Sequence, residues 1–452
     1  MGRRDHRRHR RPAAEAGVQA VSGGTLGVRT SPAPPVRIVH VGLGAFHRSH
    51  LAWYTAHASD ASEWGIAAYT GRSAGLAEDL SAQDGLYTLV VRSTAGDEAE
   101  RIGSIVRAHP GTDISGFLTD VAAPATAVVS LTITEAAYAD QALPLDRTLL
   151  SDSKDTDLSD TRPSTAIGRL VLGLEARRRA GSGALALVSC DNLPENGGVL
   201  RQAVHSVATE VPGLVDWIDA HVSFVSSSVD RITPRLSDEE TTELSQRYGD
   251  RVPVVAEPFS DWVIAGEFPA GRPQWESAGA RFTGDLEPWE ARKLWLLNGA
   301  HTLLASLGRL RGHLTVSEAI ADAECLGAVD AYWDEACRHL PAELELPEYR
   351  AALLERFRNP RIRHLLAQIA LDADTKMRVR IAPVAERERA AGRTAAACVA
   401  VVAAWLAIDG GASDHAGAER AVADLSPALG ADEVFVDAVL AGRRSLGDLT
   451  LR

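Results

Sequence analysis

The chain has 452 residues, a length that favours two domains over one. With 45% hydrophobic and 24% charged residues, it has the composition of a globular protein and not of a disordered or fibrous one. The formal net charge of −13 argues against nucleic acid or an anionic membrane as the main partner.

Three further features exclude other classes of protein. The four cysteines lie far apart, without the spacing of a zinc site or of a disulfide framework, so we expect no metal. The longest apolar run, Ala395–Ile408, is shorter than the roughly 20 residues that span a bilayer. Residues 1–35 predict a disordered basic tail, and no apolar segment of a secretory signal follows the basic start. We therefore expect a cytoplasmic protein.

Short apolar runs alternate with helical stretches between residues 36 and 285. The runs that predict strands are Val36–Val41, Trp64–Thr70, Ala127–Thr134, Ala184–Ser189 and Val222–Val229, and Ala166–Ala180 is one of the helical stretches between them. Strands that alternate with helices in this way indicate an α/β domain with a doubly wound, mostly parallel sheet.

From residue 286 to residue 452 the pattern becomes helical. The predicted helices are Trp289–Arg309, Val316–Cys337, Tyr349–Phe357, Ile362–Asp372, Ala395–Asp409 and Ala418–Leu425. Strand-like runs are scarce here, so we expect an all-helical second domain that begins near Leu286.

A glycine-rich turn follows the first predicted strand. Gly42 allows a tight turn, and Gly44 lets the backbone approach the pyrophosphate of a dinucleotide at the start of the next helix. The third position of the GxGxxG pattern is His47, so either the helix stands further from the strand or His47 and Arg48 contact the cofactor themselves. The expected cofactor-binding residues are Gly42, Gly44, Ala45, Phe46, His47 and Arg48.

The second predicted strand is equivocal about the choice of cofactor. A carboxylate about 20 residues after the glycines usually accepts hydrogen bonds from the ribose of NAD. Here Gly71, Arg72 and Ser73 follow the strand, and Arg72 could accommodate a 2′-phosphate. We expect NAD and leave NADP open.

Lysine is rare in this chain, with Lys154, Lys293 and Lys376 the only three among 47 basic residues. A position that remains lysine amid so many arginines is a candidate for proton exchange, which a guanidinium does not perform. Lys154 lies in an acidic, polar loop, whereas Lys293 lies in the segment EPWEARKLWLLNGAH.

That segment gathers polar groups on one side of a predicted helix. At about 100° per residue around the helix axis, Glu290 lies at about 60° from Lys293, His301 at about 80° and Asn298 at about 140°. Leu294 lies within this arc and Trp295 lies next to it, which favours the lining of a cleft over an amphipathic surface helix. An amine desolvated among such neighbours can act as a general base near neutral pH. An amide can stabilise a developing alkoxide.

Four motifs, GLGAFHRSH, SCDNLPENG, VDRITP and KLWLLNGAH, occur in this order and together resemble the long-chain, zinc-independent mannitol dehydrogenase family. The resemblance runs from about Val36 to the C-terminal helices. It implies a Rossmann-type domain, a helical domain, and metal-independent hydride transfer between a nicotinamide and a sugar carbonyl.

The resemblance also implies roles for particular residues. Lys293 is the implied general acid and base, and Asn192 and Asn298 are the implied pair that polarises the carbonyl oxygen. The other implied roles are contacts of substrate hydroxyls with His301 and Asp230, a proton-channel carboxylate at Glu290, and a lysine near the substrate at Lys376.

The chain departs from the family pattern beside Lys376. Where Arg-Ile followed by Asp-Gly is expected, it has Gln368-Ile-Ala-Leu-Asp372-Ala373. Nearby arginines either substitute for the missing cation or are surface charges; these are Arg361, Arg363, Arg378 and Arg380. Substrate specificity is therefore the least determined property.

The sequence thus favours an NAD-dependent oxidoreductase that converts a polyol or aldonate to its 2-ketose, with mannitol and fructose as the default pair. Mannonate and fructuronate come next. Altronate and tagaturonate, arabinitol and xylulose, or a phosphorylated hexitol (as for a mannitol 1-phosphate 5-dehydrogenase) remain open. The protein is expected to act as a monomer or small homo-oligomer.

Two rival functions make different predictions. A non-catalytic nicotinamide sensor would bind the cofactor without turnover and would lack the set of Lys, Asn and His side chains. An RNA or membrane adaptor would depend on the basic residues 1–35 and would bind with strong salt dependence. The intact polar set and the acidic remainder of the chain disfavour both.

Overall fold

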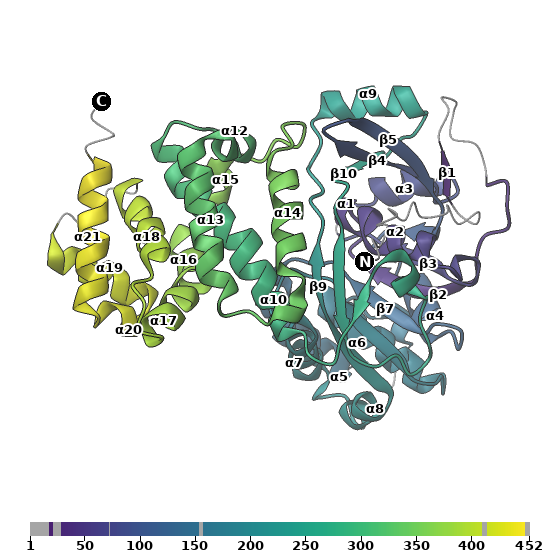
Figure 1. Cartoon of the computed structure of the whole chain (residues 1–452). Coiled ribbons are helices and arrows are strands. Elements are labelled where there is room, and N and C mark those ends of the chain that lie inside the picture. The colour runs from purple at the N-terminus through teal and green to yellow at the C-terminus, as the bar shows by residue number, and fades with distance from the viewer. Residues whose placement is uncertain (1–17, 21–28, 72, 153–156, 409–413, 448–452) are drawn as a thin grey trace, which may run out of the picture. The chain divides into compact units, whose positions relative to one another are not determined.

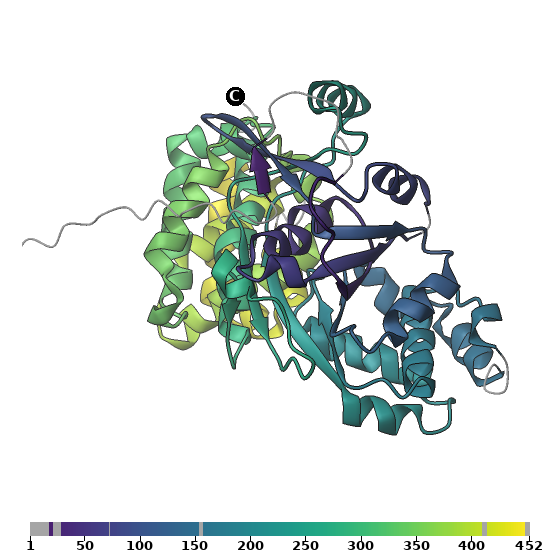
Figure 2. The same cartoon turned by 90° about the vertical axis from the view of Figure 1, so that its right-hand side faces the viewer.

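A computed structural model describes residues 18–20, 29–71, 73–152, 157–408 and 414–447. The chain divides into two compact units. The N-terminal unit comprises residues 1–91, 97–256 and 260–284, and the C-terminal unit comprises residues 92–96, 257–259 and 285–452. Figures 1 and 2 show the N-terminal unit in purple to teal and the C-terminal helices in green to yellow.

An eight-stranded sheet forms the centre of the N-terminal unit, in the order β12-β11-β9-β8-β7-β2-β3-β6. Its strands are β2 (Val36–Val41), β3 (Gly65–Tyr69), β6 (Ile105–His109), β7 (Val128–Leu131), β8 (Leu185–Ser189), β9 (Val222–Asp230), β11 (Asp261–Ala265) and β12 (Arg281–Phe282). The six strands from β6 to β9 pair in parallel, and β11 pairs antiparallel with β9. Numbered along the chain, these six parallel strands have the order 3-2-1-4-5-6 of a Rossmann sheet.

Both faces of this sheet are covered, because successive residues of a strand point to opposite sides. Val39 and Val41 pack on one face in a core with α4, α6, α7 and α8, whereas Ile38 packs on the other face with α2 and α3. The helices are α1 (Ala45–Ser49), α2 (Leu51–His57), α3 (Gly75–Ser81), α4 (Ile114–Ala122), α5 (Leu143–Asp152), α6 (Ala166–Arg179), α7 (Asn196–Ala208), α8 (Leu214–His221) and α9 (Asp238–Tyr248). The sheet is doubly wound, as the sequence predicts.

A second, four-stranded sheet has the order β1-β5-β4-β10, with β1 (Val18–Ala20), β4 (Tyr87–Ser93), β5 (Gly96–Ile102) and β10 (Val254–Ala256). The backbone of β1 pairs antiparallel with β5, and the guanidinium of Arg29 donates to the carbonyl of Ile105 at 2.6 Å. Residues 18–20 and Arg29 of the predicted disordered tail therefore make defined contacts, the former with the backbone groups at the edge of β5 and the latter with β6. Residues 1–17 and 21–28 of that tail lie outside the described residues.

The C-terminal unit is helical around one apolar core, into which Trp333, Phe357, Met377 and Trp405 are buried. Its helices are α10 (Glu287–Arg292), η6 (Lys293–Asn298), α11 (Gly299–Leu303), η7 (Leu304–Gly308), α12 (Val316–Ala321), α13 (Ala323–Cys337), α14 (Leu346–Phe357), α15 (Leu366–Ile369), α16 (Ala373–Arg380), α17 (Ala382–Ala390), α18 (Ala396–Ile408), α19 (His415–Leu425), α20 (Pro427–Gly430) and α21 (Glu433–Gly447). The helix predicted over Val316–Cys337 is interrupted, since Asp322 is extended and caps α13.

Candidate active site

The glycine-rich turn after β2 lies where the strand order reverses, between β2 and β7. Gly42 has a φ of +102°, and a Cβ there would lie 2.0 Å from the carbonyl oxygen of Thr132. The Thr132 hydroxyl in turn donates to the carbonyl of Gly42 at 2.8 Å. Both the left-handed backbone and the close approach of the two loops therefore require glycine at position 42.

Gly44 differs, because its backbone is extended, with a φ of −152°. A Cβ at Gly44 would meet only the carbonyl oxygen of Gly42, at 3.6 Å. Helix α1 begins at the next residue, and the first N–H groups of a helix have no partner within it. Open space beside the backbone and unpartnered N–H groups fit a dinucleotide pyrophosphate, so this turn can hold NAD.

The side chains of His47 and Arg48 are buried in the N-terminal unit. The ring of His47 stacks on His40 with centroids 3.4 Å apart, and burial lowers the pKa of His47 well below its usual range. The guanidinium of Arg48 donates to the carbonyls of Gly44, at 3.2 Å, and of Val252. Cofactor contacts from these two residues would involve the backbone, and their cofactor role, like that of Ala45 and Phe46, stays a prediction. Arg72 lies outside the described residues.

The loop after β8 is fixed by a buried carboxyl group. Asp191 accepts hydrogen bonds from the backbone N–H of Ile133, at 2.7 Å, and from the hydroxyl of Tyr138, at 2.5 Å. It is 6% exposed, and burial raises the pKa of Asp191 to about 7. The neighbouring Asn192 is exposed at the carboxyl end of β8. Asp191 thus ties the loop that carries Asn192 to the loop after β7.

The third motif, VDRITP, contacts the first. Arg231 donates to the carbonyl of Ser49 at 2.6 Å, and the hydroxyls of Thr233 and Ser49 lie 2.6 Å apart. Asp230 is buried at the carboxyl end of β9. The carboxyl ends of β2, β7, β8 and β9 thus bring together three of the four motifs, at the edge of a parallel sheet where ligands bind.

The fourth motif does not form a regular α-helix. Lys293–Asn298 is a π-helix, with hydrogen bonds between residues five apart, between α10 and α11. On an α-helix, the side chains of Lys293 and Asn298 would lie about 140° apart around the helix axis. On the π-helix this angle is smaller, and it resembles the angle between residues four apart on an α-helix. The predicted regular projection is wrong at this point, and Lys293 and Asn298 lie closer in angle than it gives. Both residues are half-buried, as is Glu290 in α10.

Packing from α13 supports the π-turn. The indole N–H of Trp333 donates to the carbonyl of Leu296 at 2.8 Å, which satisfies a carbonyl inside the turn. A Cβ at Gly299 would lie 2.5 Å from the hydroxyl of Tyr332, so glycine lets α11 pack closely against this buried tyrosine. These contacts give physical reasons for the tryptophan and the glycine around the motif.

His301 is 7% exposed, and its ring packs against Phe357 and His364 with centroids 4.9 Å and 4.7 Å away. Burial, with the nearby His364, Arg356 and Arg380, lowers the pKa of His301 well below its usual range. Its Nε2 is buried and has no hydrogen-bond partner among the described residues. A neutral His301 therefore has a ring nitrogen to offer to a substrate hydroxyl.

Lys376 is half-buried on α16. Its ammonium donates to the carbonyl of Ile369 at 3.0 Å and to that of Leu371, and burial lowers the pKa of Lys376. Gln368, at the position where the family pattern has arginine, is exposed. The substrate contact of Lys376 stays a prediction. In the structure, its ammonium binds carbonyl groups at and just after the C-terminal end of α15.

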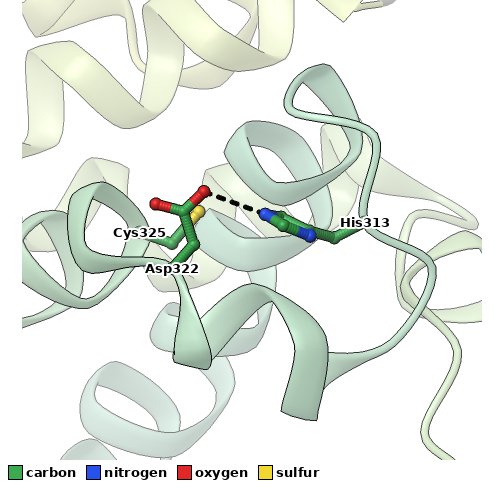
Figure 3. Close-up of side chains that lie close together, drawn as sticks. All are labelled: His313, Asp322 and Cys325. Atoms are coloured by element: carbon green, nitrogen blue, oxygen red, sulfur yellow. Dashed lines mark hydrogen bonds and ion pairs between the residues drawn. The ribbon is translucent and has the colours of Figure 1, made fainter.

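One cluster has the residue types of a metal site. The ligand atoms of His313, Asp322 and Cys325 lie within 4.8 Å of one another. Figure 3 shows the three side chains gathered at this point. However, Arg311 donates to the carboxylate of Asp322 at 2.7 Å, and burial raises the pKa of Cys325 to about 11. Asp322 caps α13, and its carboxylate is already held by Arg311 and by His313, so these contacts account for the cluster as an N-cap with an ion pair.

Sequence reasoning missed several residues at these sites. Tyr138 and Thr132 hold the two loops of the sheet edge, but they lie outside the motifs. Asp191 closely follows a buried strand, and from the sequence both a polar group at the ligand-binding edge and a residue of the turn were open interpretations. His364 and Arg380 approach His301 and Asn298 from elements remote in sequence, and one sequence alone does not show such proximity.

The comparisons with known proteins agree with this geometry. A family sequence model for the mannitol dehydrogenase Rossmann domain matches residues 36–277, and one for the mannitol dehydrogenase C-terminal domain matches residues 285–447. The chain belongs to the mannitol dehydrogenase family. The family resemblance of the four motifs is thereby confirmed.

Relatives within the family act on several sugars. The D-mannonate oxidoreductase of Escherichia coli is 38% identical over 359 residues, which are 76% of this chain and 74% of the relative. The mannitol 2-dehydrogenase of Cereibacter sphaeroides is 35% identical over 395 residues, 83% of this chain and 81% of the relative. The Pseudomonas fluorescens mannitol 2-dehydrogenase, solved with NAD and D-mannitol, superimposes with a TM-score of 0.73 at 32% identity, covering 92% of both chains.

This family member is therefore an NAD-dependent oxidoreductase that acts on a CH–OH group, as the sequence predicts. A D-sorbitol dehydrogenase structure also superimposes, with a TM-score of 0.80 at 29% identity over 92% of this chain and 95% of that one. Among the described residues, no helix is both long enough and apolar enough to cross a membrane.

Proposed function

We propose that this enzyme interconverts a secondary alcohol of an open-chain polyol or aldonate with the corresponding ketone, and that Lys293 is its general acid and base. The observation that carries the proposal is the π-turn, which closes the angle between a half-buried amine, Lys293, and a half-buried amide, Asn298. Bound NAD supplies the hydride acceptor in oxidation and, as NADH, the hydride donor in reduction. The turn at Gly42 and Gly44 is its proposed pyrophosphate site.

The remaining roles follow from the chemistry of each side chain. In oxidation, neutral Lys293 accepts the proton of the substrate hydroxyl while a hydride leaves the carbon that bears this hydroxyl. In reduction, protonated Lys293 donates to the carbonyl oxygen, which the amide N–H groups of Asn298 and Asn192 polarise. Glu290, one turn before Lys293, exchanges the proton with solvent.

His301 and Asp230 are the proposed partners of substrate hydroxyls, and Lys376 is a further proposed substrate contact. Mannitol with fructose is the default pair of the sequence analysis, and mannonate with fructuronate is the alternative. Relatives that act on each support this breadth. We place the enzyme in the cytoplasm, as a monomer or small homo-oligomer, with a sugar and no nucleic acid as partner, which the net charge of −13 supports.

The test is a set of NADH and NADPH oxidation assays, followed by absorbance, with fructose, fructuronate, tagaturonate, xylulose and fructose 6-phosphate. The proposal predicts turnover of at least one ketone with NADH. NADH binding without turnover of any ketone in a wider set of keto sugars and keto acids would instead favour the sensor function.

A further inference from the structure

The four arginines near Gln368 differ in their surroundings. Arg361, Arg363 and Arg378 are exposed, whereas Arg380, at the end of α16, is half-buried. One terminal nitrogen of Arg380, Nη1, donates to the carbonyl of Asn298 at 3.3 Å and to the hydroxyl of Thr302 at 3.1 Å. Arg380 is therefore the cation of this group that touches the proposed catalytic turn.

Within the described part of the chain, no carboxylate contacts the other edge of the Arg380 guanidinium, which carries Nε and Nη2. Its Nε is buried without a hydrogen-bond partner, and among the described residues Arg380 forms no ion pair with a carboxylate. A partly buried charge without a counter-ion is unfavourable, and burial lowers the pKa of Arg380 to about 10. Even so, Arg380 remains charged at neutral pH.

In Arg356, the corresponding edge of the guanidinium, formed by Nε and Nη2, binds a carboxylate. Its Nε and Nη2 each donate at 2.8 Å to one oxygen of the Glu257 carboxylate, and both side chains are almost fully buried. Arg356 and Arg380 both lower the pKa of His301, so both charges lie near it. The charge of Arg356 is neutralised by Glu257, whereas that of Arg380 is not. One uncompensated positive charge therefore lies beside Asn298 and His301.

We propose that the Nε–Nη2 edge of Arg380 binds the terminal carboxylate of the substrate, so that the enzyme acts on an aldonate and its keto acid in preference to a neutral polyol and ketose. The inference rests on the proposed function, because it takes Asn298 and His301 as the site of the carbonyl and hydroxyl contacts. A carboxylate would supply the missing counter-ion with two charge-assisted hydrogen bonds, which a hydroxyl does not. In oxidation, a hydride and a proton leave the alcohol of the aldonate, and the carboxylate is unchanged.

The test compares fructuronate with fructose in NADH-dependent reduction by the wild type and Arg380→Met. We expect the wild type to show a kcat/KM at least about 100-fold higher for fructuronate. Arg380→Met also removes the contacts of Nη1 with Asn298 and Thr302, so the expected signature is a difference: kcat/KM for fructuronate should fall about 10²- to 10³-fold more than kcat/KM for fructose, mainly through KM. Arg380→Lys should recover part of the loss. Arg378→Met, on the same helix with an exposed arginine, is the matched control and should behave as the wild type.

Equal kcat/KM values of the wild type for the two substrates would overturn the inference. An equal loss of Arg380→Met on both substrates would also overturn it, because it would make Arg380 a support of the π-turn. If Arg380→Met does not fold, the test is inhibition of the wild-type reduction reaction by mannonate and by mannitol. Mannonate should inhibit far more strongly, and equal inhibition by the two would overturn the inference. Turnover of fructose but not fructuronate would leave the proposed function standing, whereas inactivity with every ketone would overturn both.

Discussion

The two regions that carry the proposed functional residues, one in each unit, are built in different ways. At the sheet edge of the N-terminal unit, strand topology places the loops, and buried polar side chains such as Asp191 and Arg231 tie them together. In the C-terminal unit, the position of Lys293 relative to Asn298 depends on a local departure from α-helical geometry, which Trp333 supports from another helix. The first arrangement follows from general rules of α/β folds, whereas the second depends on tertiary packing.

The largest expected effect is that of Lys293→Met, which removes the amine and keeps an unbranched side chain. We expect kcat to fall by about 10³- to 10⁴-fold, because no other group takes the proton in the proposed reaction. NADH binding, measured by fluorescence titration, should be unchanged because the cofactor turn belongs to the other unit. Activity within tenfold of the wild type would contradict the assignment of Lys293.

Asn298→Ala should lower kcat by about 10²- to 10³-fold, the usual cost of losing one donor to a developing oxyanion. Steady-state kinetics with a saturating ketone and NADH measures it. An effect confined to KM would mean that Asn298 binds the ground state and the transition state equally.

Gly42→Ala and Gly44→Ala form a matched pair at the cofactor turn. Gly42→Ala introduces a Cβ 2.0 Å from the Thr132 carbonyl oxygen at a positive φ, so it should lower the thermal midpoint by several degrees. Gly44→Ala meets no such obstacle, so its thermal midpoint should stay near that of the wild type. Its Kd for NADH should rise about tenfold or more, because the added methyl group occupies the proposed pyrophosphate space. Unchanged NADH affinity in Gly44→Ala would contradict the proposal that the pyrophosphate binds beside Gly44.

The last expected effect concerns the pH dependence of stability and not activity. Because the pKa of Asp191 is raised to about 7 in the folded state, its carboxyl keeps a proton that the unfolded chain releases above about pH 4. Stability should therefore fall as pH rises from about 4 to 7, by up to about 1.4 kcal/mol per pH unit from this group. Asp191→Asn should remove this dependence, so its thermal midpoint relative to the wild type should rise across that range.

Asp414→Asn, at the exposed N-cap of α19, is the control for the pH series and should track the wild type. A constant difference between Asp191→Asn and the wild type from pH 4.5 to 7.5 would show that Asp191 is ionised throughout.

Much of the fold could be predicted from the sequence, because its strands and caps follow local patterns. Val36–Val41 is apolar and β-branched and forms β2 at the predicted bounds. The run Val222–Val229 is predicted as a strand and forms β9 (Val222–Asp230). The sequence analysis does not predict β11 (Asp261–Ala265), which pairs antiparallel with β9.

The candidate site could be predicted only as a set of residues. A regular helical projection misplaces Asn298, because Lys293–Asn298 is a π-helix. Trp333 and Tyr332, which pack against Leu296 and Gly299, come from another helix. The side chain of His47, expected to be available to a cofactor, is instead stacked on His40 inside the unit. The π-turn is packed against α13, and the ring of His47 is packed against His40 of β2. Periodicity and motif spacing encode neither contact.

The most direct test of the central claim is a double-mutant cycle on kcat/KM with Lys293→Met, Asn298→Ala and the double variant. If the π-turn makes Lys293 and Asn298 act as one catalytic unit, the double variant should be no more than about threefold slower than Lys293→Met alone. Fully additive losses, with the double variant a further 10²-fold slower or more, would mean that the two residues act independently and would contradict the account.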